Sequence, residues 1–177
     1  MVDLQPSSSD LADLLVRMTE LEWPTTELER LRFFDALGLR DSESPRPDEH
    51  VPGSERRLFV TDLSSTLSGT STMFHGQFLG LGLFAYDEPI ENGELARVGY
   101  AAVRERVSQR LGLPVEEWGT DDEPACLWHP GPLMLDMYCF QRHRSGIMVG
   151  PDHADRSAAY DDAAAALEAR STLFDQD

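Results

Sequence analysis

The sequence predicts a single α+β domain over residues 1–177, with an antiparallel sheet of about five strands. Two observations lead to this class. Apolar residues recur at helical spacing in four segments, and runs of β-forming residues separate those segments in groups. With 177 residues, 41% of them hydrophobic, the chain is long enough to bury one sizeable core. The expected order α-α-β-β-α-β-β-β-α groups its strands, which favours antiparallel pairing over alternating βαβ units.

The first helix is expected at residues 9–21, with Ser8 or Ser9 as its N-cap. The dipeptide Trp23-Pro24 ends it, because proline disfavours a helical residue before it. A second helix follows at once, so the two should form a helical hairpin with Trp23 packed near its corner. The apolar residues of the first helix are Leu11, Leu14, Leu15, Met18 and Leu21.

The second helix is expected to begin at Thr26, which forms a possible capping box with Glu29. Gly38 is a natural residue to end it, because glycine adopts the left-handed backbone at low cost. The apolar face expected for this helix consists of Leu28, Leu31, Phe34 and Leu37.

Residues 40–55 are predicted to form a mobile loop, because prolines and a glycine stand among acidic residues there. From residue 57 the pattern favours β-structure. One strand is expected around Leu58 and Val60, a turn at residues 68–71, and a long strand at residues 73–86. The alternation of the long strand slips at Gly80 and Gly82, which indicates a bulge or a bend.

A central amphipathic helix is expected from Asn92-Gly93 to Gly112. Three strands should follow at residues 125–128, 133–141 and 146–149, with a turn at 129–132 between the first two. A C-terminal helix is expected at residues 158–174. The apolar side of the central helix contains Leu95, Val98, Ala102, Val107 and Leu111. The last helix has Tyr160, Ala164, Leu167 and Phe174 at helical spacing.

The charge is the unusual property of the composition. The chain contains 32 Asp and Glu against 15 basic residues, all of them Arg, for a formal net charge of −17. A surface of this sign repels nucleic acid and anionic membranes, so neither is expected as a partner. It attracts a basic protein or a cationic ligand. Residues 1–10 lack a signal-peptide pattern, and the longest apolar stretch, residues 78–86, is too short to span a bilayer, so a cytoplasmic protein is expected.

One set of residues has the composition of a zinc site, namely Cys126, His129, Cys139 and His143. Its spacing argues against that use. Residues three apart in an extended strand point to opposite faces, and free cysteines in strands are usually small buried hydrophobes. No metal and no cofactor are therefore expected.

No catalytic set is recognisable in the sequence. A Gly-x-Ser-x-Gly nucleophile motif does not occur, residues 68–72 lack the lysine of a phosphate-binding loop, and Gly80-x-Gly82 lacks the third glycine of a dinucleotide fingerprint. His75, placed on the long strand, is the best-positioned histidine. Asp136 is the acid of most interest, because strand alternation places it on the face opposite Leu135 and Met137. No residue is predicted to be catalytic, and a non-catalytic protein is favoured.

Four short segments carry a resemblance to a known group of proteins. They are Leu21-Glu22-Trp23-Pro24, Leu37-Gly38-Leu39, Leu111-Gly112-Leu113-Pro114 and Cys126-Leu127-Trp128. Together with the acidic surface, they resemble the immunity proteins of bacterial polymorphic toxin systems. Secretion chaperones, which usually have one N-terminal helix instead of two, are similar in element order and are the second choice. The resemblance implies a protein that neutralises a basic toxin by direct binding.

The partner-binding residues are expected in three acidic segments, residues 41–49, 116–123 and 152–162. They are Asp41, Glu43, Asp48, Glu49, Glu116, Glu117, Asp121, Asp122, Glu123, Asp152, Asp155, Asp161 and Asp162.

Two other functions stay open. One is an enzyme or a small-ligand-binding protein with a pocket between the sheet and the helices, lined by Phe74, Phe78, Trp128 and Tyr138. The other is an accessory subunit of a larger assembly, which an exposed apolar patch of Leu79, Leu81 and Leu83 would favour. A ligand that binds the folded state would raise the melting temperature and so identify the first.

Overall fold

A computed structural model describes residues 3–89, 93–141 and 143–174. Within these ranges the chain forms four helices and one antiparallel sheet of nine strands, in the order β1-β3-β4-β5-β9-β8-β7-β6, with β2 also paired to β3. The α+β class is therefore confirmed, but the sheet is almost twice as wide as predicted. The helices are α1 (Ser8–Glu20), α2 (Glu27–Leu37), α3 (Glu94–Leu111) and α4 (Ala154–Phe174). The strands are β1 (Leu39–Asp41), β2 (Arg46–Pro47), β3 (Ser54–Thr61), β4 (Ser68–Phe74), β5 (Gln77–Pro89), β6 (Glu116–Gly119), β7 (Pro124–Trp128), β8 (Leu133–Gln141) and β9 (Arg144–His153).

The turn between β4 and β5 lies at His75-Gly76, near the start of the long strand predicted at residues 73–86. Both residues have left-handed backbones, with φ of 48° and 74°, and Phe74 pairs with Gln77 across the turn. Two consecutive left-handed residues suit a tight hairpin, because their twist matches that of the strands. The predicted turn at residues 68–71 is wrong, since these residues belong to β4. The bulge predicted near Gly80 is confirmed, because the β4–β5 register shifts there.

The remaining unpredicted strands are short edge strands. In the segment 40–55, expected to be irregular, Arg40 and Asp41 belong to β1, Pro47 lies in β2, and Ser54 begins β3. Proline is tolerated in β2 because an edge strand has backbone donors that need no partner. At the other edge, β6 pairs with β7 over an acidic segment that showed no strand pattern.

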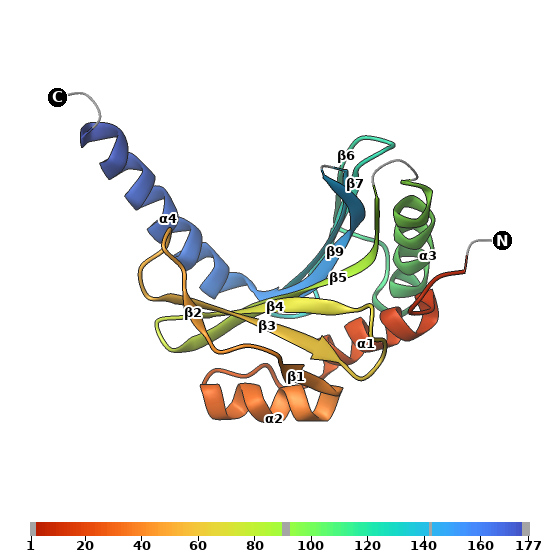
Figure 1. Ribbon diagram of the computed structural model, residues 1–177, viewed down its shortest axis with the longest axis horizontal. Helices are drawn as coiled ribbons and strands as arrows, with labels where there is room; N and C mark the ends of the chain where they lie inside the picture. The colour runs from red at the N-terminus through yellow and green to blue at the C-terminus, as the bar shows by residue number, and fades with distance from the viewer. Residues whose placement is uncertain (1–2, 90–92, 142, 175–177) are drawn as a thin grey trace.

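Helices α1, α2 and α3 lie against one face of the curved sheet, and α4 rises from the opposite face at one end (Figure 1). The two N-terminal helices follow each other as predicted, but they do not form a closely packed hairpin. α1 packs chiefly on α3, where Arg110 lies 3.2 Å from Asp13, whereas α2 packs on β1. Trp23 does lie at the corner between them, with its ring 5.4 Å from that of Phe33 and 5.0 Å from that of Phe78.

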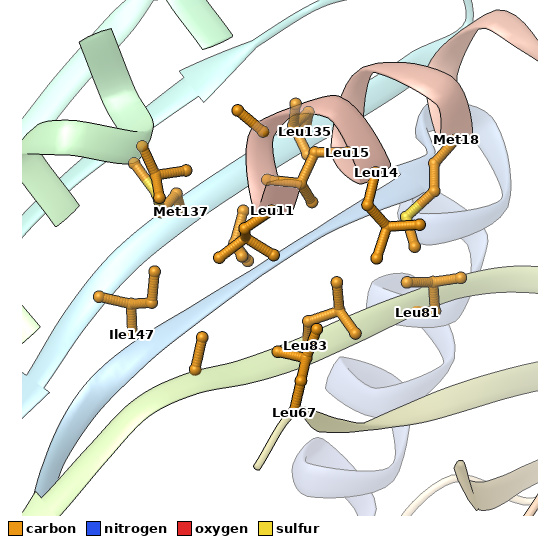
Figure 2. Close-up of a cluster of buried hydrophobic side chains, with 14 of the residues drawn as sticks. Leu11, Leu14, Leu15, Met18, Leu67, Leu81, Leu83, Leu135, Met137 and Ile147 are labelled. Carbon is orange, nitrogen blue, oxygen red and sulfur yellow. The ribbon is translucent and has the colours of Figure 1, made fainter. Parts of the chain in front are cut away.

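The main core lies between the sheet and these three helices. From α1, Leu11, Leu15 and Met18 are fully buried, and they face Leu83 and Leu135 on the central strands (Figure 2). Burying a side chain of this size stabilises the fold by about 1.5–3 kcal/mol. Ser7, and not the predicted Ser8 or Ser9, caps α1 through a 3.1 Å hydrogen bond from the backbone N–H of Asp10.

The inner face of α2 differs from the prediction, although its ends do not. The capping box of Thr26 and Glu29 is present, and Gly38 ends the helix with φ of 68°. Leu28 and Leu31, expected to be buried, are 59% and 47% exposed. Their place is taken by Arg30, whose side chain is fully buried and which lies 4.5 Å above the ring of Phe34.

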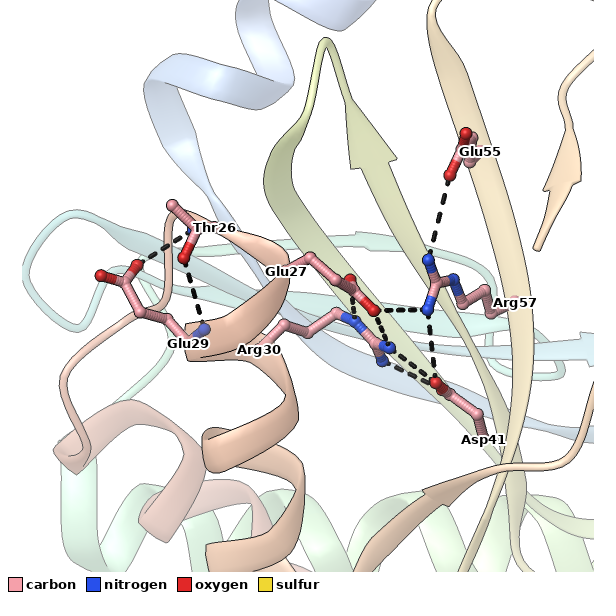
Figure 3. Close-up of polar contacts among 7 residues, drawn as sticks. All are labelled: Thr26, Glu27, Glu29, Arg30, Asp41, Glu55 and Arg57. Carbon is pink, nitrogen blue, oxygen red and sulfur yellow. Dashed lines mark hydrogen bonds and ion pairs between the residues drawn. The ribbon is translucent and has the colours of Figure 1, made fainter. Parts of the chain in front are cut away.

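Arg30 is buried because two carboxylates surround its guanidinium group. It donates hydrogen bonds of 2.8 and 2.9 Å to Glu27 and of 3.0 and 2.6 Å to Asp41 (Figure 3). Arg57 of β3 contacts the same two acids. Bidentate pairing of this kind satisfies a buried charge, so α2 is tied to β1 and β3 by a polar cluster and not only by apolar packing.

The buried face of α3 is rotated from the predicted one. It consists of Ala96, Gly99, Tyr100, Val103 and Val107. Val98 is 38% exposed, and a β-carbon at Gly99 would overlap the ring of Tyr86, so a small residue is required at that contact. Gly112 ends the helix as expected. Asn92, expected to open it, lies outside the described residues, as does the side chain of Phe174 at the end of α4.

None of the helices, over the ranges given above, has the length and apolar character needed to cross a membrane.

Candidate functional site

Of the helices that the structure describes, α4 alone lies over the face of the sheet away from α1, α2 and α3, and it does so at one end (Figure 1). Residues opposite one another in antiparallel strands have their side chains on the same face, so the register identifies this surface, which we call the open face. One row of neighbours across it is Arg56, Thr72, Gly80, Asp152 and Met134. A second row, from β3 to β6, is Val60, Ser68, Phe84, Met148, Tyr138, Ala125 and Trp118. Between these rows lie Leu58, Thr70, Gly82, Asp136, Leu127 and Glu116.

A cleft of about 530 Å³ lies on the open face, between the central strands and the base of α4. Its floor includes Gly80 and Gly82, and Tyr138 and Met148 stand on neighbouring strands beside it. From α4, Ser157, Tyr160 and Asp161 line it. A concave site with aromatic side chains and a few convergent polar groups has the character of a ligand-binding or partner-binding site.

Two carboxyl groups of the central strands, Asp136 of β8 and Asp152 of β9, line this cleft. Asp136 pairs with Gly150, two residues from Asp152, so the two acids are diagonal neighbours on one face. Diagonal neighbours have α-carbons about 7–8 Å apart, close enough for both carboxyl groups to contact one small ligand. The sequence-based expectation that Asp136 faces away from Leu135 and Met137 is confirmed, because both of those side chains are fully buried in the core.

Both carboxyl groups are hard to ionise. Burial raises the pKa of Asp136 to about 6. Burial, together with the negative charges of Asp136 and Asp161, raises the pKa of Asp152 to about 8. No cation among the described residues offsets these effects. At neutral pH Asp152 therefore holds a proton for much of the time, and a cation that entered the cleft would favour its release.

Two polar side chains, Arg156 and Tyr160, fix the wall formed by α4 to the rest of the domain. Arg156 donates hydrogen bonds of 2.8 and 2.5 Å to the backbone oxygens of Pro24 and Phe78, and one of 2.9 Å to the hydroxyl of Thr25. One turn further, the hydroxyl of Tyr160 donates to Asp48 at 3.1 Å. A small apolar cluster also packs against α4. It contains Val51, Phe74 and Leu79, with Tyr160, Ala163 and Ala164 of α4 packed against them.

The acids predicted from the first segment mostly serve the fold. Asp41 bonds to Arg30 and Arg57, and the side chain of Asp48 is only 6% exposed because it accepts hydrogen bonds from the backbone of His50 and from Tyr160. Both carboxyl groups are thus engaged in contacts within the domain. Glu43 pairs with Arg46 at 2.5 Å, and Glu49 is exposed.

The acids of the second segment surround the β6–β7 hairpin. Glu116 lies on the open face, whereas Glu117 pairs with Arg104 of α3 on the other side. Asp122 lies 3.5 Å from Arg97, and Glu123 accepts a 2.8 Å hydrogen bond from the backbone of Gln141. Asp121 is exposed. Glu116 is thus the member of this segment that shares a face with the cleft.

The acids of the third segment meet at the cleft more closely than the others. Asp152 lies on its floor and Asp161 on its α4 wall. Asp155 and Asp162 are exposed on the same helix. The structure therefore brings together Asp136, Asp152 and Asp161, of which the sequence analysis assigned the first to no partner site.

Several other predicted sites are rearranged. His75 lies in the β4–β5 turn, not within a strand. The four residues expected to line one pocket are separated: Phe78 and Trp128 are in the main core, Phe74 is under α4, and Tyr138 is at the cleft. The space between the sheet and α1–α3 is filled by core side chains. The patch expected of Leu79, Leu81 and Leu83 is not exposed, since all three side chains are buried.

The candidate zinc residues Cys126 and Cys139 both lie in the main core. Burial raises the pKa of these thiols to about 11 and about 12, so both stay protonated at neutral pH. His129 and His143 are exposed. Across the parts of the chain that the structure describes, no group of three or more His, Cys, Asp or Glu side chains is placed to hold a metal ion.

The sequence analysis missed the apolar members of the open face. Leu58, Val60 and Trp118 are 41%, 37% and 51% exposed. The sequence pattern places Leu58 and Val60 in a strand but predicts no binding role for them, and Trp118 lies in a segment for which only acidic contacts are predicted. Strand alternation is the signal that could have placed Leu58 and Val60 on the open face. Their neighbour Phe59 is fully buried in the core, and adjacent residues of a strand point to opposite faces.

A comparison of the chain with models of known protein families, with curated proteins and with solved structures finds no match.

Proposed function

We propose that this is a non-catalytic binding protein that uses the open face to hold and inhibit a basic protein partner, in the manner of an immunity protein. The observation that supports the proposal most is the difference between the two faces of the sheet. One face is buried under three helices, whereas the other presents exposed apolar side chains around an acid-lined cleft. Apolar anchors beside polar groups are typical of protein interfaces.

The charge supports a basic partner. The chain has a net charge of −17, and Glu116, Asp136, Asp152 and Asp161 lie on or beside the open face. A field of this sign accelerates the encounter with a positively charged protein and disfavours acidic competitors. A toxin that acts on nucleic acid is positively charged where it binds phosphates, so an acidic inhibitor covers that surface well.

The test is co-purification with the product of the adjacent gene, using two matched substitutions. Trp118→Ser removes an exposed apolar side chain from the open face, and Leu28→Ser removes one from the outer side of α2. We expect Trp118→Ser to weaken the complex about tenfold or more and Leu28→Ser to have little effect. Raising the salt concentration should weaken the complex as well.

Two results would contradict the proposal. One is a complex that tolerates Trp118→Ser and Leu58→Ser as well as it tolerates Leu28→Ser. The other is the absence of any complex with the neighbouring product at low salt.

A small-ligand-binding protein is the second candidate function, and the volume of the cleft favours it. At about 530 Å³ the cleft is large enough for a small organic molecule. A metabolite that raised the melting temperature in proportion to its concentration, with loss of the effect in Asp152→Asn, would support this function over the first.

A further inference from the structure

The carboxyl groups that line the cleft on the open face have no cation between them among the described residues. Asp136 and Asp152 lie side by side on neighbouring strands, and Asp161 faces them from α4. Among the described residues that line the cleft, Arg56 alone carries a positive charge, and it lies 3.2 Å from Asp48. Two carboxyl groups on a sheet floor, with no cation of the described chain between them, form a site for a cationic group.

A second observation points to a ligand independently of these acids. Ser157 of α4 lines the cleft and is only 7% exposed, and its hydroxyl has no hydrogen-bond partner among the described residues. A buried hydroxyl without a partner loses free energy relative to one that is hydrogen-bonded. A ligand with hydrogen-bond donors would supply the missing partner, because a hydroxyl oxygen accepts as well as donates.

The remaining walls favour a flat cation over a compact one. Tyr138 and Tyr160 line the cleft with aromatic side chains, and Tyr160 is held in place by its 3.1 Å hydrogen bond to Asp48 and by its contact with Phe74. Met148 adds a polarisable apolar side chain. A guanidinium group stacks on aromatic rings, carries five donors in a plane and is less strongly hydrated than an ammonium group. It therefore fits these walls better than a lysine side chain does.

We propose that the cleft receives the guanidinium group of one arginine side chain of the basic partner, held between Asp136 and Asp152. This inference rests on the proposed function for the source of the arginine. The groups facing the bound cation are the carboxyls of Asp136, Asp152 and Asp161, the phenols of Tyr138 and Tyr160, and the guanidinium of Arg56. Because Asp152 is partly protonated at neutral pH, binding releases a proton to the solvent.

The experiment measures binding of the tripeptide acetyl-Gly-Arg-Gly-amide to the full chain by isothermal titration calorimetry at pH 7.5. The control peptide carries citrulline, which has the shape of arginine without its charge, and a third peptide carries lysine. We expect the arginine peptide to bind weakly, with a Kd of about 1 mM. The lysine peptide should bind several-fold more weakly, and the citrulline peptide should not bind. Titration in two buffers of different ionisation enthalpy should show release of protons.

Two variants locate the site. Asp152→Asn removes the carboxylate but keeps the shape of the protonated acid, so it should fold and should weaken arginine binding about tenfold. Asp162→Asn removes the same charge from the exposed side of α4 and should leave the affinity within about twofold. Asp136→Asn repeats the test from the neighbouring strand, and a melting curve of each variant verifies its fold.

Equal binding of the arginine and citrulline peptides, or no binding at about 10 mM, would overturn the inference. So would an unchanged affinity in both Asp152→Asn and Asp136→Asn. These results differ from failure of the proposed function. If the partner still binds in a manner sensitive to Trp118→Ser, only the arginine assignment fails, and if no partner binds at all, the peptide result stands by itself.

Discussion

The side chain of Asp152 on β9 occupies the space that a β-carbon at Gly80 on β5 would fill. The two residues are direct neighbours across the strands, so the glycine makes room for the carboxyl group on the floor of the cleft. The backbone of β9 is also close, because the α-carbon of Asp152 lies 3.0 Å from the position of such a β-carbon. The irregular pattern of glycines in β5 thus serves the cleft as well as the bend of the strand.

Gly80→Ala should lower the free energy of unfolding by about 2 kcal/mol or more, because the added methyl group overlaps a carboxyl group and nearby backbone. Gly82→Ala is the matched control. Its β-carbon would meet the far end of the flexible Met148 side chain, so its cost should be smaller. Urea unfolding measures both changes. Combining Gly80→Ala with Asp152→Ala should recover part of the loss, and strictly additive effects would show that the two residues are not coupled.

Asp152→Asn should stabilise the protein at high pH. A carboxyl group whose pKa is raised on folding binds its proton more tightly in the folded state, so stability falls as pH rises from the unfolded value near 4 to the folded value of about 8. Asparagine does not ionise, so the variant does not lose stability in this way as the pH rises. The difference in unfolding free energy between variant and wild type should be small at pH 4 and reach about 1–2 kcal/mol at pH 8.5, with the openness of the cleft limiting its size.

The control for this comparison is Asp162→Asn on the exposed surface of α4. It lowers the overall negative charge equally, so it reports any general relief of repulsion. A gain in stability that is equal in both variants, or independent of pH in Asp152→Asn, would contradict the raised pKa of Asp152.

Arg30→Met should destabilise the fold by about 3 kcal/mol, because Glu27 and Asp41 lose the buried cation that pairs with both and keep only Arg57. Arg30→Lys should lose less stability than Arg30→Met but more than none, since one ammonium group cannot form two bidentate pairs. Arg40→Met is the control. Arg40 pairs with Asp62 at 2.8 Å, but both side chains are more than 60% exposed, so the cost should stay below about 1 kcal/mol. Similar losses at Arg30 and Arg40 in chemical denaturation would show that burial of the pair is unimportant.

Cys126 and Cys139 should be unreactive in the native protein at pH 8. Both side chains lie in the core, and burial raises their pKa values to about 11 and about 12, so almost no thiolate forms. A chromogenic disulfide reagent should therefore label neither until urea unfolds the chain, when both should react. Ser42→Cys, at an exposed position, provides the reactive control. Fast labelling of the native wild type would contradict the burial of these thiols.

Only part of the open face, and of its proposed use as an interface, can be predicted from the sequence. The acidic composition predicts a cationic partner, and alternation in the strand around Asp136 places that acid away from the core. Trp118 was out of reach, because the four residues of β6 carry two glutamates and a glycine and become a strand only by pairing with β7. The cleft itself combines residues of β3, β4, β5, β8, β9 and α4, which are distant in the sequence and extend from Arg56 to Asp161.

Local physics explains which elements the sequence by itself determined. Thr26, Glu29, Gly38 and Gly112 mark helix ends because caps depend on residues within a few positions of one another. The apolar residues Leu11, Leu14, Leu15 and Met18 predicted for α1 are also buried, whereas tertiary structure decided which faces α2 and α3 bury. In α2, Arg30 is inside and Leu28 outside because the acid of β1 and the arginine of β3 complete an ion-pair cluster around it. Tertiary structure also decided that Asp136 and Asp152 share a cleft, because register between distant strands depends on the packing of the whole sheet.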